Sequence, residues 1–324
     1  MALAQAAMAQ AKEGVIMSLM PPAIEELGNS SGFSLHLQAA AGGQGGHAQG
    51  HGKPQRRHAD QHGGGHGLQP FNGKAGAILE AWYAGQYAGQ AVAEIVYGKV
   101  NPSGKMPVSV AKKESDYPSY ASYNDVAAYQ PAGLFGAPGT AKAEMTYSEG
   151  IYTGYRGFDR RNTKPLYPFG FGLSYTRFTY SDMKLSASTL GGSETIAATF
   201  TLTNRGDMDG FEVAQLYVSP GATSKVDRPE KELKGFAKVF LKAGQSKRVT
   251  IPLDARSLSY YVQNTDTWNV DKANYTIRVG GASDDLPLQQ TLKTTVAQQL
   301  NTNTSNPLPA PVRAAVQVSA DQKY

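Results

Sequence analysis

The segment "TIAATFTLTNRGDMDGFEVAQLYVSP" (Thr195–Pro220) decides the fold of the C-terminal part of the chain. Apolar and polar residues alternate up to Asn204–Gly210, and beyond it Val213, Leu216 and Val218 stand against polar neighbours. A period of two predicts half-buried β-strands. We interpret NRGDMDG as a hairpin turn, because it lacks the spaced ligands and terminal Glu of a calcium loop.

The same pattern continues over residues 178–297, with turns such as Lys-Ala-Gly-Gln between strands, and predicts an antiparallel β-sandwich. Before it, residues 75–177 mix both kinds of element. Ala77–Gly85 reads as a buried strand, and the following segment reads as a helix that stops at Gly98. A strand is expected at Ile151–Phe158. The predicted fold class is therefore α+β.

The two ends of the chain differ from this middle part in composition. Residues 1–40 predict a helical fragment, and residues 298–324 read as a tail. Residues 41–68 hold ten glycines and five of the six histidines, with no aromatic residue. Such a stretch cannot bury enough apolar area to offset its ordering entropy, so residues 41–74 are expected to form a disordered linker.

Composition excludes several function classes. The net charge of +5 over 324 residues, without a dense Lys/Arg stripe, argues against nucleic-acid binding. Cysteine is absent, which rules out disulfides and thiolate chemistry. No apolar run reaches the length of a membrane span, and no secretion signal is recognised at the N-terminus, so the compartment stays open.

Four motifs, in this order, carry a family resemblance: "AILEAWYAGQYAGQAVAEIVYGKVNPSGKMPVSV", "EGIYTGYRGFD", "KPLYPFGFGLSYTRFTY" and "GFEVAQLYVSP…RPEKELKGFAKVFLKAGQSKRVTIPL". They resemble the C-terminal part of glycoside hydrolase family 3, which includes β-glucosidases and β-xylosidases. The resemblance implies the end of an α/β sandwich domain over residues 75–177 and a fibronectin type III-like, immunoglobulin-like sandwich over residues 178–297. Residues 1–38 resemble a fragment of a resistance-nodulation-division efflux pump, which suggests a chimeric gene.

The resemblance also implies a retaining mechanism, with an aspartate nucleophile on an N-terminal barrel and an acid/base glutamate upstream of "AILEAWY". Both positions fall outside this chain, so no catalytic residue is carried over. We expect a truncated glycosidase that is inert alone, because retention needs two carboxyl groups about 5–5.5 Å apart. One alternative is a non-catalytic sandwich that binds a glycan or a partner. Another is a metal-dependent enzyme of a different class.

A few residues remain candidates for chemistry. Glu149 and Asp159 are candidates for an acid or base role, although a structural ion pair is the commoner use of such residues. Aromatic and cationic side chains suited to binding an oligo- or polysaccharide are Trp82, Tyr152, Tyr155 and Arg156. The competing interpretation is packing between domains, with Gly170 and Gly172 allowing tight backbone turns.

The histidine-rich segment offers metal ligands but no defined site. Its histidines are His47, His51, His58, His62 and His66. Some lie at i, i+4 spacing, which suits a helix face, but the intervening glycines oppose helix formation. We expect no cofactor, and only adventitious divalent-metal binding there. Because residues 75–177 hold part of a sheet, exposed edges predict homo-oligomerisation.

Overall fold

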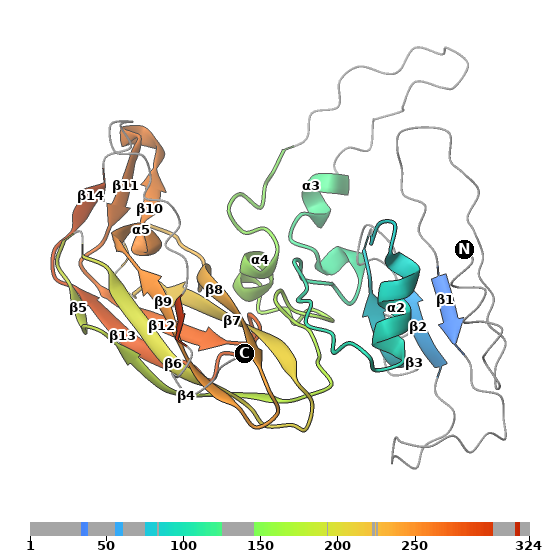
Figure 1. Cartoon of the computed structure of the whole chain (residues 1–324). Coiled ribbons are helices and arrows are strands. Elements are labelled where there is room, and N and C mark those ends of the chain that lie inside the picture. Colours follow the sequence, from blue (N-terminus) through green and yellow to red (C-terminus); the bar gives the residue numbers. More distant parts are fainter. Residues whose placement is uncertain are drawn as a thin grey trace, which may run out of the picture. The chain divides into compact units, whose positions relative to one another are not determined.

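The chain forms two compact units, Met1–Val100 and Asn101–Tyr324, shown in Figure 1. The computed structural model describes residues 34–37, 56–60, 75–82, 84–124, 146–192, 194–221, 224, 226–300 and 315–317. Within these ranges, no helix combines the length and the apolar character needed to cross a bilayer.

The described part of the first unit is a three-stranded sheet and one helix. Strand β2 pairs antiparallel with β1 and parallel with β3. The elements are β1 (Ser34–Leu37), β2 (Arg56–Asp60), β3 (Ala75–Glu80) and α2 (Ala88–Val96). Strand β1 lies within the segment expected to be a helical fragment, and strand β2 lies within the expected linker. The other residues of both segments lie outside the described residues.

The strand and helix expected around Trp82 are present with shifted bounds. The strand ends at Glu80 and the helix begins at Ala88, so Trp82 lies in the connection. The helix stops as predicted: Gly98 has φ +71°, a left-handed conformation that glycine adopts without strain. The apolar face buries Ala88 and Val92.

The second unit is built on two antiparallel-type sheets packed face to face (Figure 1). One has the order β15-β9-β6-β4 and the other β5-β13-β12-β7-β8, in which only the short β5 runs parallel to its neighbour. The strands are β4 (Phe178–Leu185), β5 (Thr189–Leu190), β6 (Ile196–Asn204), β7 (Gly210–Ser219), β8 (Glu232–Leu241), β9 (Ser246–Leu253), β12 (Asn274–Gly280), β13 (Leu288–Thr294) and β15 (Ala315–Gln317).

A small third sheet, β10-β11-β14, completes the second unit. Its strands are β10 (Tyr260–Val262), β11 (Thr267–Val270) and β14 (Gln298–Leu300), preceded or joined by α5 (Ala255–Leu258) and the 3-10 turn η3 (Gln263–Thr265). Asp254 caps α5 by accepting from the Ser257 amide at 2.8 Å. Strands β14 and β15 both fall in the segment expected to be a tail.

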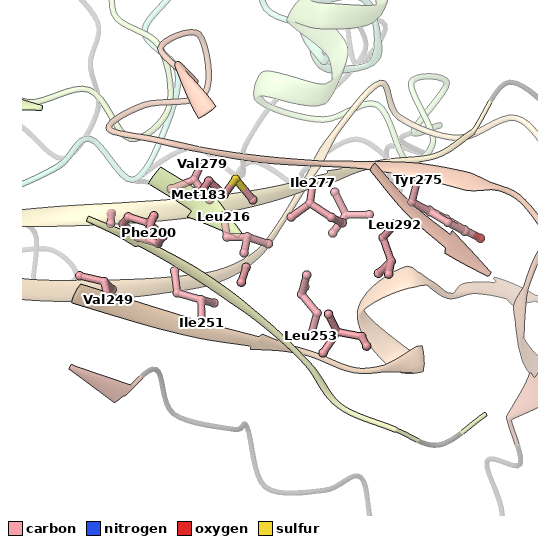
Figure 2. Packing of buried hydrophobic residues seen from close by; sticks show 14 of the residues in the cluster. Met183, Phe200, Leu216, Val249, Ile251, Leu253, Tyr275, Ile277, Val279 and Leu292 are labelled. Carbon is pink, nitrogen blue, oxygen red and sulfur yellow. The ribbon is translucent and has the colours of Figure 1, made fainter. Parts of the chain in front are cut away.

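The core between the two large sheets is apolar, as Figure 2 shows. It takes alternate residues of each strand: Ile196, Ala198, Phe200 and Leu202 of β6 are all 3% exposed or less. This confirms the sandwich predicted from the period of two.

Two details of the segment Thr195–Pro220 differ from expectation. Leu216 and Val218 are buried in the core, but Val213 has the opposite parity and lies on the other face of β7, half-buried. The hairpin interpretation of Asn204–Gly210 is wrong, because β6 and β7 belong to different sheets. The glycines serve close packing instead: a Cβ on Gly206 would lie 2.3 Å from the Thr176 Oγ1.

Residues 101–177 contribute short helices and extended loops to the second unit. The helical elements are η2 (Glu114–Asp116), α3 (Tyr120–Asn124) and α4 (Tyr155–Arg160). The strand expected at Ile151–Phe158 is therefore wrong. Gly154, with φ +54°, precedes α4, and the i, i+3 spacing of Tyr155 and Phe158 suits a helix that packs both rings.

Candidate functional site

Helix α4 and the start of β8 bring several of the candidate residues into one ionic group. We call it the α4–β8 cluster; its members are Tyr155, Arg156, Asp159, Arg228, Lys231, Glu232 and Lys234. The two elements are far apart in sequence, and backbone-to-side-chain and ionic contacts join them. The Leu233 amide donates to the Tyr155 hydroxyl at 2.9 Å.

One carboxylate, that of Glu232, receives three cations in the α4–β8 cluster. Its Oε1 lies 3.3 Å from Arg156, and its Oε2 lies 3.5 Å from Arg228 and 3.4 Å from Lys234. Arg228 is nearly buried and also donates to the Leu258 carbonyl at 3.1 Å. Burial lowers the pKa of Lys234, Glu232 opposes this, and the charges of Arg228 and Arg156 lower it further.

Asp159 forms a tight pair with Lys231. The carboxylate Oδ2 lies 2.7 Å from the Lys231 Nζ, and the side chains are 20% and 7% exposed. Burial raises the pKa of Asp159 despite the hydrogen bond from Lys231 and its charge, which both lower it. A structural ion pair explains this arrangement, since one carboxylate is matched by one ammonium group.

The aromatic candidates of this region pack within the chain. The Tyr155 ring lies 5.1 Å from that of Phe169 and 5.9 Å, edge-on, from that of Tyr217. Burial raises the pKa of Tyr152, whose ring lies 4.9 Å below the Arg160 guanidinium. These contacts support the packing interpretation for both tyrosines, while saccharide binding by them stays a prediction.

Glycine lets the backbone around Gly170 approach strand β7 closely. Gly170 has φ +81°, and a Cβ there would lie 2.2 Å from the Gln215 Oε1. The Gln215 amide donates to the Gly170 carbonyl at 3.1 Å and to the Gly281 carbonyl at 2.6 Å. The backbone around Gly170 therefore covers part of the outer face of β7, and the buried Gln215 amide there has hydrogen-bond partners.

Glu149 lies outside the α4–β8 cluster. Its Oε2 accepts a 2.5 Å hydrogen bond from the Ser122 hydroxyl, and this bond is the main reason that the pKa of Glu149 is lowered. A general acid at neutral pH needs a raised pKa. The local structure thus favours an ionised, hydrogen-bonded carboxylate over an acid.

Trp82 and the histidines are not brought to the α4–β8 cluster by any described contact. Trp82 belongs to the first unit, has φ +48°, and its amide donates to the Glu80 Oε1 at 3.2 Å. His58 lies in β2 opposite His36 of β1, whereas His47, His51, His62 and His66 lie outside the described residues. Among described residues, no three side chains of His, Asp or Glu are grouped to hold a metal ion.

A shallow depression of about 270 Å³ lies between β4 and β13. No carboxylate lines it; its residues are Met183, Lys184, Leu185, Ser188, Gln290 and Thr291. An acid–base pair of the glycosidase kind therefore has no counterpart there.

The sequence pattern does not indicate a role for Arg228, Lys231, Glu232 or Lys234, which all lie in the motif "RPEKELKGF". The available signal was the charge density of that motif directly before an alternating strand. Such a run is usually a solvated face. Here Lys231 pairs with Asp159 of α4 and Glu232 pairs with Arg156 of α4. The side chains of Arg228, Lys231, Glu232 and Lys234 are all 20% exposed or less.

Two family models match the chain. The one described as glycosyl hydrolase family 3 C-terminal domain matches residues 61–175, and the one described as fibronectin type III-like domain matches residues 212–283. Similar curated proteins include probable β-glucosidase K of Emericella nidulans, 37% identical over 70% of this chain and 24% of that protein. Thermostable β-glucosidase B of Acetivibrio thermocellus is 38% identical over 69% of this chain and 28% of its own length.

Solved structures agree. The β-glucosidase of Kluyveromyces marxianus, determined in complex with glucose, superposes with a TM-score of 0.61 at 34% identity, over 71% of this chain and 25% of that chain. The β-glucosidase of Bifidobacterium adolescentis gives 0.61 at 36% identity, over 70% and 31%. This chain spans about a quarter of the length of the curated relatives it matches. Over the matched residues the chain belongs to glycoside hydrolase family 3, of which it carries the C-terminal region with the fibronectin type III-like domain.

Proposed function

We propose that this chain is a non-hydrolytic module of a β-glucosidase-type protein, which supports a catalytic part carried elsewhere. The observation that carries the proposal is that both candidate carboxylates are bound by partners within this chain. Glu149 is held ionised by Ser122, and Asp159 is paired with Lys231 at 2.7 Å. Within the described ranges, neither pairs across a cleft with a second acidic group, as retaining hydrolysis requires.

The test is hydrolysis of an aryl β-glucoside by the purified chain, with and without EDTA. We expect no turnover above buffer in either condition. Turnover that survives EDTA and disappears in Glu149→Gln or Asp159→Asn would overturn the proposal. Turnover that EDTA abolishes would also overturn it, in favour of a metal-dependent activity of the histidine-rich segment.

A second arm tests the supporting role directly. The Acetivibrio thermocellus relative is truncated before the region that matches this chain, and the truncated protein is assayed alone and mixed with this chain. If this chain supports the catalytic part, hydrolysis is low for each alone and rises at least tenfold in the mixture. An unchanged rate in a mixture of two folded proteins would contradict the supporting role.

A further inference from the structure

The positive charge around Glu232 exceeds what the carboxylate can balance. Arg156, Arg228 and Lys234 all pair with it at 3.3–3.5 Å, so two positive charges remain locally. The side chain of Arg228 is 3% exposed and that of Lys234 is 20% exposed, and salt screens partly buried charges much less than exposed ones. The excess positive charge should therefore continue to attract anions at physiological salt concentration.

Neighbouring ion pairs do not remove this surplus. They are matched one to one: Lys231 with Asp159, Arg160 with Asp227, and Arg278 with Glu230. Two further carboxylates lie near the cluster: Asp284 acts on Tyr217, and Asp271 acts together with Arg228 on Tyr260 and Tyr275. Within the described ranges, neither forms an ion pair with Arg156 or Lys234, for which Glu232 is the paired carboxylate.

A β-bulge places Lys234 in this position. Pairing between β7 and β8 passes from Leu216 opposite Gly235 to Tyr217 opposite Leu233, which leaves Lys234 without a residue opposite it. Bulges re-aim side chains in this way and bend the strand. The ammonium group consequently joins the guanidinium of Arg156, which α4 brings to the same carboxylate.

We propose that Arg156 and Lys234, beside Glu232, bind a small dianionic oxyanion of the phosphate class. A guanidinium has five N–H donors and an ammonium three, and Glu232 is the ion-pair partner of both side chains within the described ranges. A dianion balances the two surplus charges. Arg156 is 36% exposed and provides access from solvent, while Arg228 contributes charge from inside.

The proposal is tested by the thermal midpoint of the full chain and by phosphorus NMR, with inorganic phosphate as the probe and sodium chloride at matched ionic strength as the control. We expect phosphate, and not chloride, to raise the midpoint with saturation. Phenyl phosphate serves as the second arm: equal binding indicates that the phosphoryl group of a larger molecule fits, and failure to bind indicates a site for the free ion.

Variants separate this site from non-specific attraction. Lys234→Met and Arg156→Gln should each weaken phosphate binding at least tenfold, whereas Lys242→Met, at an exposed turn, should change it less than twofold. Once inorganic phosphate is fully dianionic, a further rise in pH should weaken binding as Lys234 loses its proton, and this decline should be absent in Lys234→Met. Equal losses in Lys234→Met and Lys242→Met, or no phosphate effect beyond chloride, would overturn the proposal. If Lys234→Met does not fold, the more exposed Arg156→Gln decides by NMR.

Discussion

Replacing Asp159 by asparagine should destabilise the second unit through its partner, not through its own contacts. The Lys231 ammonium group, 7% exposed, would keep its charge but lose its counter-ion at 2.7 Å. Removing one member of a buried ion pair costs about 3–5 kcal/mol in free energy of unfolding. We expect about 3 kcal/mol here, because Asp159 is 20% exposed and water reaches the site.

The double variant Asp159→Asn/Lys231→Met should recover most of that loss. Both side chains are largely buried, so each charge loses most of its hydration in the folded protein. Removing both charges then removes both desolvation penalties. Stability within about 1 kcal/mol of the parent chain is expected for the double variant, with a coupling energy of about 2 kcal/mol or more.

Urea denaturation followed by tryptophan fluorescence measures these differences in a Trp82→Phe background, which leaves Trp268 of the second unit as the reporter. An unchanged m-value is the check that compactness is preserved. Asp227→Asn is the matched control, because its pair with Arg160 spans 3.0 Å but both side chains are more than half exposed. The control should change stability by less than about 0.5 kcal/mol. A loss equally small in Asp159→Asn, or strictly additive losses in the double variant, would refute the reasoning.

Two further predictions concern the same unit. Gly170→Ala should lower stability by about 2 kcal/mol in the same urea assay, because its Cβ would meet Gln215, whereas Gly244→Ala, also at positive φ but with open space, should cost about 1 kcal/mol. Asn204→Ala should cost about 2–3 kcal/mol by thermal denaturation, since its buried amide donates to two carbonyls.

The β-sandwich was predictable because its signal is local. The alternation of apolar and polar residues along β6 indicates which residues face the core, and no other strand is needed to see it. The same alternation does not state which strand lies alongside, so the expected hairpin at Asn204–Gly210 is wrong even though both flanking strands exist. Sheet membership depends on contacts between distant residues, and one sequence read alone contains little of that information.

Helix α4 and its ionic contacts show the opposite case. Tyr155 and Phe158 have strand-like chemistry, and what makes them helical is a glycine at positive φ together with two separate ring contacts, to Tyr217 and Tyr117. Asp159 pairs with Lys231, and the two residues are separated by 72 positions in the sequence. The candidate carboxylate could be named from sequence, but its role was fixed by a partner that no spacing rule connects to it. An acidic residue in a family motif is therefore better judged by the cation that neutralises it than by the motif itself. By that criterion the unbalanced charges at Glu232, and not Asp159, mark the place where this module has capacity to bind something more.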